Sequence, residues 1–184
     1  MTLKNVIDAA IDNAGLRRLN ALPPDAAHAQ FLACCGAGAW ADRMTARRPF
    51  ASVEQVHEDA TRFFANLSDA DWKEAFSSHP QIGQTAGANA PKALALDGTS
   101  KWSTQEQSGV NGASQQIMTE LAELNKVYFE KFGYIYIVCA SGKSADGMLD
   151  LLKQRRAHDP QTEWTVAAAE QAKITHLRLD KLLL

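Results

Sequence analysis

Two short segments on either side of a glycine-rich stretch carry the side chains best suited to chemistry. His79 precedes Pro80 in SSHPQIG, and Ser103 and Glu106 lie in WSTQEQSGV. An imidazole of ordinary pKa, about 6.5, exchanges protons near neutral pH, and a carboxylate can orient it. Each residue also has a plainer explanation, because His79 could be a surface residue and S-x-x-E is an ordinary capping box. The residues alone predict a candidate His–Glu site and leave both alternatives open.

Other patterns associated with catalysis or metal binding are incomplete. SGKS at 141–144 resembles the end of a phosphate-binding loop, but Ile137 stands where that loop needs glycine. Glu54 and His57 have the spacing of one half of a di-iron ligand set, and the second half is missing. We therefore interpret them as a solvated pair, and no HExxH motif or G-x-S-x-G elbow is present. The sequence predicts neither a metal site nor a covalent nucleophile.

The elements around the two segments predict how they are positioned. Ser68 caps a short helix that turns Trp72, Ala75 and Phe76 inward, and Pro80 disfavours its continuation through His79. The glycine-rich stretch, 81–101, is predicted to be a long surface loop. A long helix is predicted to begin near Ser103 and to stop at Gly133. Its apolar stripe is Ala113, Ile117, Leu121, Leu124 and Tyr128.

The rest of the chain also reads mainly as helix. YIYIVCA at 134–140 must be buried, in an extended or helical form that periodicity does not decide. Helix starts are predicted at Pro24, Ser52, Ser144 and Asp159. The last helix has a broad apolar face made of Trp164, Ala167, Ala168, Ile174 and Leu177. We predict an all-α bundle of about eight helices with one short buried extended segment, in a single domain over 1–184.

The composition narrows the function classes. The chain has 184 residues, 46% of them hydrophobic, and 19 basic against 21 acidic residues give a formal net charge of −2. Such a balance, without a basic cluster, argues against nucleic-acid binding. No run approaches the about 18 apolar residues of a membrane span, and we see no signal peptide. The three cysteines are too few and irregular for a disulfide framework, so we expect a cytoplasmic protein with reduced thiols.

Four separated segments together resemble a known family. HPQIG, WSTQEQ, NKVYFEKFGYIYIVCASGKS and EWTVAAAEQAKITHLRL closely resemble the 2-oxo-4-hydroxy-4-carboxy-5-ureidoimidazoline (OHCU) decarboxylase family. The amino-terminal LNALPPDAAHAQFLACCG is similar to the same family, so the resemblance covers nearly the whole chain. It implies a homodimeric, all-α enzyme without metal or organic cofactor. Such an enzyme converts OHCU to (S)-allantoin and CO2, the third step from urate.

The resemblance also implies roles for particular residues. The histidine of the HP motif is the essential acid–base residue of the family, which is His79 here, and Glu106 is expected to be its catalytic partner. Pro80 is expected beside the substrate. Ser103 and Gln107 of the S-x-x-E-Q motif are expected to bind it. The end of the apolar segment is expected to contact the ligand at Ile137, Cys139, Ala140 and Ser141.

One departure from the family pattern concerns a substrate contact. Some branches carry an arginine where this chain has Ser141, so no guanidinium contact is carried over. A lysine such as Lys143 lacks the bidentate geometry of arginine.

Two rival functions remain for comparison. A helical interaction module predicts no site joining His79 and Glu106, and a hydrolase of another cyclic ureide predicts an activated water and a metal.

Overall fold

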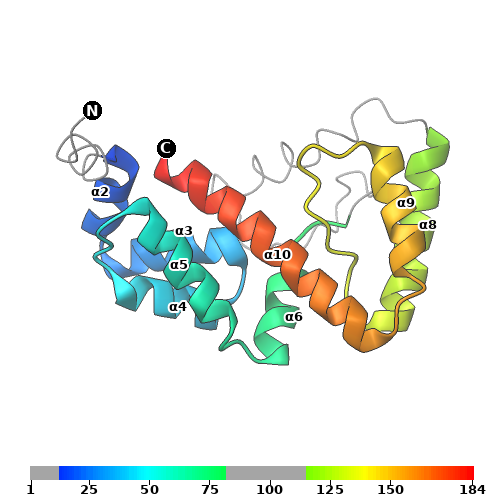
Figure 1. The fold of residues 1–184 in the computed structure, drawn as a ribbon, viewed down its shortest axis with the longest axis horizontal. Coiled ribbons are helices and arrows are strands. Elements are labelled where there is room, and N and C mark those ends of the chain that lie inside the picture. The colour runs from blue at the N-terminus through cyan, green and yellow to red at the C-terminus, as the bar shows by residue number, and fades with distance from the viewer. Residues whose placement is uncertain (1–12, 82–114) are drawn as a thin grey trace. The chain divides into compact units, whose positions relative to one another are not determined.

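The chain folds as a set of helices (Figure 1). The structure, a computed structural model, describes residues 13–81 and 115–184. None of the described residues lies in a β-strand, which confirms the predicted all-α class. The described helices are α2 (Ala14–Ala21), α3 (Pro24–Cys35), α4 (Gly38–Arg47), α5 (Val53–Phe64), α6 (Asp69–Ser77), α8 (Gln115–Phe132), α9 (Ala145–Arg155) and α10 (Pro160–Leu183).

The predicted helix boundaries are set by local side-chain chemistry. Helix α3 begins at Pro24 and stops at Gly36, whose φ of 87° is the left-handed conformation that glycine tolerates. The Ser52 side chain accepts a hydrogen bond from the Gln55 N–H at the start of α5. Ser144 does the same for Gly147 at the start of α9. These caps satisfy N–H groups that the first turn of a helix leaves without partners.

The buried extended segment is also confirmed. Residues 135–140 have neither helical nor strand pairing, and the side chains from Tyr136 to Ala140 are at most 7% exposed. Gly133, with a φ of 76°, ends α8 directly before this segment. The predicted loop over 81–101 and the predicted helix start near Ser103 lie almost wholly outside the described residues, which resume at Gln115.

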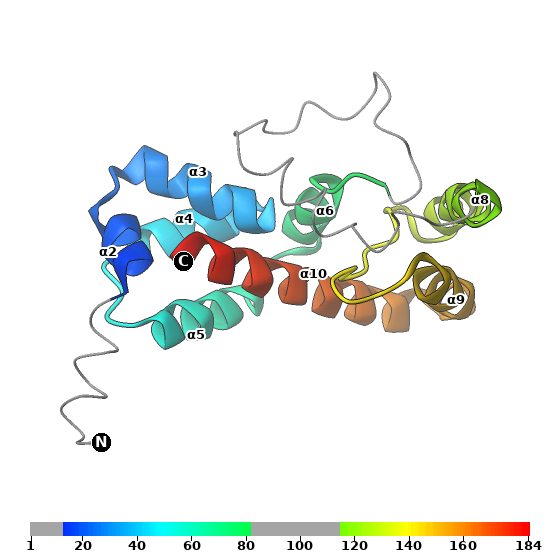
Figure 2. The ribbon, with the colours of Figure 1, turned by 90° about the horizontal axis from the view of Figure 1, so that it is seen from above.

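The chain divides into two compact units, each described here by itself. Unit 1 comprises Met1–Trp72 and Ile174–Leu184. Its core is aromatic: Phe31 packs edge-on against Trp40, and Trp40 stacks on Phe64, with ring centroids 6.1 and 5.5 Å apart. Helices α3 and α4 lie side by side in this unit (Figure 2). The last residues of α10 complete it, since the Arg18 guanidinium donates to the Leu182 carbonyl at 2.9 Å.

Unit 2 comprises Lys73–Lys173. Helices α8 and α9 lie side by side in both views (Figures 1 and 2). Phe76 at the end of α6 packs against Tyr134 and Trp164, with centroid distances of 5.1 and 5.6 Å. Every residue that we predicted for the candidate site and that the structure describes lies in this unit. No helix in the described ranges has the length and apolar character that crossing a membrane requires.

Candidate active site

His79 lies just beyond the carboxyl end of α6. The helix ends at Ser77, and the His79 N–H still donates to the Phe76 carbonyl at 3.2 Å, so the residue closes the last turn. Pro80 follows and is exposed, and the helix has ended before it, as predicted. The half-buried His79 ring points its Nε2 at the Gln171 Oε1 of α10, 2.7 Å away. The imidazole is therefore tied to a buried residue distant in sequence.

The extended segment is held at Cys139 through its backbone. The Cys139 N–H donates to the Glu170 carboxylate at 2.7 Å, and the Cys139 carbonyl accepts from the Lys143 ammonium at 2.7 Å. Burial tends to raise the pKa of Glu170, but the hydrogen bonds from Lys173 and the Cys139 amide lower it overall. Glu170 is thus a carboxylate that clamps the backbone at Cys139.

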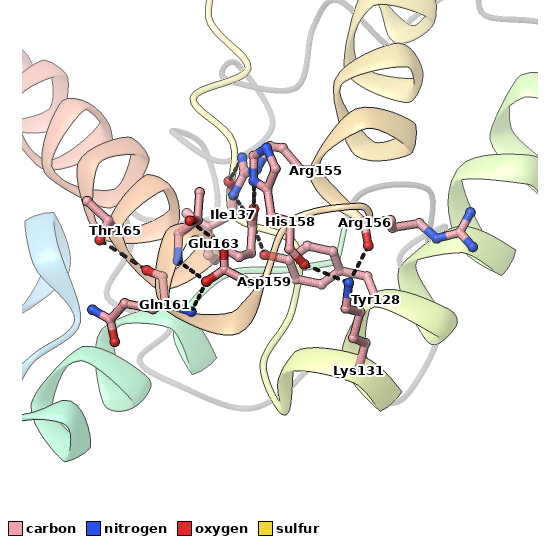
Figure 3. Close-up of polar contacts among 11 residues, drawn as sticks. Tyr128, Lys131, Ile137, Arg155, Arg156, His158, Asp159, Gln161, Glu163 and Thr165 are labelled. Atoms are coloured by element: carbon pink, nitrogen blue, oxygen red, sulfur yellow. Dashed lines mark hydrogen bonds and ion pairs between the residues drawn. The ribbon is translucent and has the colours of Figure 1, made fainter.

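A buried ionic network holds the same segment at Ile137 (Figure 3). The Arg155 guanidinium donates to the Ile137 carbonyl at 2.7 Å and to one oxygen of Glu163 through Nε at 2.9 Å. The Tyr128 hydroxyl donates to the same oxygen, while His158 contacts the other at 2.8 Å. Glu163 has no solvent exposure, and both of its carboxylate oxygens therefore have polar partners within the protein.

The charges of this network are balanced inside unit 2. Burial disfavours the Arg155 cation, but the hydrogen bond and the charge of Glu163 raise the pKa of Arg155 overall. Burial, followed by the hydrogen bond to Glu163, raises the pKa of Tyr128 far above its ordinary value. Burial also raises the pKa of Tyr134 to about 12. Near neutral pH Arg155 is therefore a cation, and the hydroxyls of both tyrosines stay protonated.

Helix α10 sets the spacing between these contacts. Glu163 and Glu170 are separated by two helical turns. Glu163 holds the extended segment through Arg155, and Glu170 contacts it directly. Trp164 and Gln171 form the adjacent row, and they contact Phe76 and His79. Because Glu170 and Gln171 are consecutive, the Cys139 amide and the His79 imidazole are bonded to neighbouring residues of one helix. The structure thus ties His79 and the predicted ligand-contacting segment to neighbouring positions of α10.

The comparison with known proteins decides the family. A sequence profile described as OHCU decarboxylase matches residues 20–180. The chain belongs to the OHCU decarboxylase family. A solved OHCU decarboxylase, crystallised in the presence of (S)-allantoin, is 36% identical, with a TM-score of 0.71 over 84% of this chain and 97% of that one. An (S)-allantoin synthase structure, 16% identical with a TM-score of 0.64, matches in fold.

The chain is also similar to curated proteins from several organisms. The uric acid degradation bifunctional protein TTL of Arabidopsis thaliana is 39% identical over 153 residues, 83% of this chain and 46% of that protein. The OHCU decarboxylase of Xenopus laevis is 28% identical over 138 residues, 75% of this chain and 76% of that one. The chain thus spans less than half of the Arabidopsis protein, and 27% of a bifunctional relative from Bacillus subtilis.

The family resemblance placed further residues in the site, and the structure describes some of them. Ile137, Cys139 and Ala140 are buried in the extended segment, and Ser141 is exposed in the turn that follows. Ser103, Glu106 and Gln107 lie outside the described residues. The expected partnership between His79 and Glu106 therefore stays a prediction.

Sequence reasoning about this OHCU decarboxylase family member missed four residues that hold the site together. Arg155, Glu163, Glu170 and Gln171 are at most 9% exposed, although charged and amide side chains in a helix are usually solvated. One signal was available: Glu163 and Glu170 repeat at a spacing of seven residues, which places them two turns apart on the same side of the predicted last helix. Their partners are too distant in sequence for a pattern to identify.

The second candidate pattern, Glu54-x-x-His57, was predicted to be a solvated pair, and the structure confirms this for only one of the two residues. Glu54 is exposed, but His57 is only partly exposed and contacts His176 through Nδ1 at 2.7 Å and Asp180 through Nε2 at 2.8 Å. The solvated pair was therefore correct for Glu54 and wrong for His57, because α10 covers the imidazole. Within the described ranges, no group of three or more His, Cys, Asp or Glu residues is arranged to hold a metal ion.

Proposed function

We propose that this chain decarboxylates OHCU to (S)-allantoin and CO2, the third step of urate degradation. The observation that carries the proposal is the family match over residues 20–180. It is supported by the 36% identical OHCU decarboxylase structure, 97% of which the match covers. The arrangement of His79 beside a clamped backbone segment is consistent with an acid–base site. We also propose that residues 1–184 act as one decarboxylase domain, in a cytoplasmic homodimer.

The substrate can accept the electrons that decarboxylation releases. Its carbinol carbon carries a hydroxyl and a carboxylate, and the neighbouring ring carbon is doubly bonded to nitrogen. When the carboxylate leaves as CO2, the electron pair of the broken C–C bond forms a double bond between the two ring carbons. The former C=N electrons move to the ring nitrogen, which takes a proton. We therefore propose no organic cofactor, since the substrate is its own electron sink.

Proton transfers then complete the product. The hydroxyl loses its proton to His79 and becomes the new carbonyl, while the neighbouring ring carbon gains a proton and becomes the stereocentre of (S)-allantoin. An imidazole is suited to this transfer near neutral pH. Glu106 accepts hydrogen bonds from the ureido N–H groups and supports His79. Ser103 and Gln107 hold the ring so that protonation occurs on one face.

The remaining contacts come from Pro80 and the extended segment. We propose that the backbone at Ile137, Ala140 and Ser141 contacts the ligand. The Cys139 N–H already donates to Glu170, so its ligand contact would be a shared, three-centre hydrogen bond. Fixed backbone groups of this kind orient a substrate at little cost in reorganisation.

One experiment separates this activity from its rivals. Freshly generated OHCU is mixed with the protein, and circular dichroism follows the (S)-allantoin formed, before and after exhaustive chelation of metal ions. Enantioselective, chelator-insensitive turnover supports the proposal. No acceleration over the spontaneous reaction would favour an interaction module. Activity lost on chelation and restored by one divalent ion would favour a metal-dependent enzyme.

A further inference from the structure

The contact between His79 and Gln171 has a chemical direction. The Gln171 atom that faces the ring is the carboxamide oxygen, Oε1, at 2.7 Å from His79 Nε2. A carboxamide oxygen accepts hydrogen bonds and cannot donate them. Nε2 must therefore carry a proton, and in the neutral ring the basic lone pair then belongs to Nδ1.

The packing around the pair holds this geometry in place. Gln171 has no solvent exposure and lies in α10, two helical turns after Trp164. The Trp164 ring packs edge-on against Phe76, which precedes His79 by three residues and accepts the His79 N–H. The end of α6, which precedes the imidazole, and the part of α10 that carries the carboxamide are therefore fixed against each other by aromatic packing.

The choice of an amide rather than a carboxylate also matters. Glu170, the preceding residue, directs its charge to the Cys139 amide and Lys173. Gln171 brings a hydrogen-bond acceptor to His79 without a negative charge. A carboxylate at the same place would stabilise the imidazolium and leave less of the neutral base.

We propose that Gln171 is a positioning residue that fixes the Nε2–H tautomer of His79 and so makes Nδ1 the atom that takes the substrate's hydroxyl proton. This inference rests on the proposed decarboxylase function for its kinetic consequence, but the tautomer itself does not. It also divides the work of the site. Gln171 fixes the tautomer of the base from α10, and Glu106 binds the ureido N–H groups and supports the ring.

The tautomer is measured directly on the full chain, without substrate. Long-range ¹H–¹⁵N correlation spectra of protein labelled with ¹⁵N-histidine distinguish the two tautomers, and a His79→Asn variant assigns the resonances among the five histidines. We expect the neutral His79 ring to be protonated at Nε2. Protonation at Nδ1 would overturn the inference without requiring any Gln171 variant to fold.

Variants then test whether Gln171 is responsible. Gln171→Met keeps the approximate shape and removes the acceptor, so we expect a mixture of tautomers and a kcat lowered by about 10-fold or more with KM nearly unchanged. The largest expected decrease in kcat is about 10²–10⁴-fold, which is the contribution of a general base. Gln171→Glu is expected to raise the pKa of His79 and to shift the acidic limb of the rate profile to higher pH.

A matched control removes general effects of changing α10. Gln161 is exposed in the first turn of the same helix, so Gln161→Glu and Gln161→Met should leave the tautomer, kcat and pH profile unchanged. If the wild-type protein is active and the folded Gln171 variants keep the same His79 tautomer and the same pH profile, the inference is overturned. Absence of turnover in the wild-type protein, with Nε2–H seen by NMR, would instead overturn the proposed function.

Discussion

At the scale of single residues, neighbouring side chains give a common residue type a specific role. His79 would be an ordinary helix-end histidine without Gln171, and Cys139 an ordinary buried residue without Glu170. The consecutive pair Glu170–Gln171 shows how one position in a helix can serve a backbone amide and the next an imidazole. The chemistry of each partner decides which of the two side chains, charged or neutral, is suitable.

The roles of His79 and Glu106 can be separated by kinetics and thermal melting. We expect His79→Ala to lower turnover by about 10²-fold or more, the scale of a lost general base. Glu106→Gln keeps most of the capping geometry and removes the charge, so a folded, equally impaired enzyme is expected. A fully active Glu106→Gln enzyme would reduce Glu106 to a helix cap, whose loss alone costs about 1 kcal/mol of stability.

Two helical glycines are expected to respond in opposite ways to alanine. A Cβ on Gly15 would lie within 2.7 Å of the Leu183 backbone, so Gly15→Ala should lower the free energy of unfolding by about 1–3 kcal/mol. A Cβ on Gly147 would meet Ser144 Oγ at an ordinary 3.4 Å, so Gly147→Ala should raise it by up to about 1 kcal/mol. Denaturant titrations of both variants measure the difference. Equal stabilisation by both would contradict the close packing of α2 on the end of α10.

At the scale of elements, α10 holds both the base and the segment proposed to contact the ligand. Its buried residues include Glu163, Glu170 and Gln171 as well as aliphatic ones. Each makes a hydrogen bond to a residue of another element, and together they hold α6 and the extended segment at fixed positions along the helix. Polar burial is costly unless satisfied, so this helix contributes position as well as stability.

Loss of the Arg155–Glu163 ion pair should strongly destabilise the fold. Removing one partner of a buried ion pair leaves the other charge uncompensated, so we expect Glu163→Ala to lower the free energy of unfolding by about 3–5 kcal/mol. The exposed pair of Lys153 and Glu120 is the control, and Lys153→Ala should cost about 1 kcal/mol or less. Similar effects of both substitutions in urea titrations would contradict the assigned importance of the network.

The contact between α5 and the end of α10 should make stability depend on pH. Burial, and then the electrostatic effect of the neighbouring His57, lower the pKa of His176 below 6.5, although Asp180 opposes this. Thr61 and the Phe64 ring also contact His176. A depressed pKa means that the unfolded chain binds the proton more tightly, so stability is full above about pH 6.5 and falls as the solution is acidified.

Melting temperatures at several pH values between 7.5 and 5 test this dependence. We expect the melting temperature to fall with pH, and His176→Gln to reduce the slope because glutamine does not titrate. An unchanged slope in that variant would assign the acid sensitivity to other groups.

Sequence patterns predicted the helices well because their boundaries depend on local chemistry. The Ser52, Ser68 and Ser144 side chains accept hydrogen bonds from N–H groups three residues away, and Pro24 suits the first turn of α3 by its own backbone geometry, so a single chain reveals them. The partner of His79 could not be predicted in this way. Gln171 is distant in the sequence, and periodicity assigns a polar residue to the solvent-facing side of a helix. The residues alone indicated His79 as a candidate and the family resemblance assigned its role, but neither indicated what holds its ring.

At the scale of the whole chain, the two units differ in how they are assembled from the sequence. Unit 2 is one continuous stretch, Lys73–Lys173, whereas unit 1 combines the stretch before it with Ile174–Leu184. The segment Ile174–Leu184 makes hydrogen bonds and an ion pair with the earlier part of unit 1. Arg178 donates to the Ala33 carbonyl at 3.4 Å, and Asp180 pairs with His57 at 2.8 Å.

This discontinuity imposes an order of events during translation. After Trp72 is made, the ribosome must add about a hundred residues before Ile174, which takes roughly 5–20 seconds at ordinary synthesis rates. Throughout that interval the nascent α3 and α5 lack the end of α10, which contacts Ala33 and Phe64, and chaperones have time to bind the exposed helices. We expect stalled nascent chains that end at Lys173, extended by a flexible linker, to remain protease-sensitive within residues 14–72. Chains stalled after Leu184 with the same linker should be protected there, and equal protection of both would mean that the early helices fold without waiting.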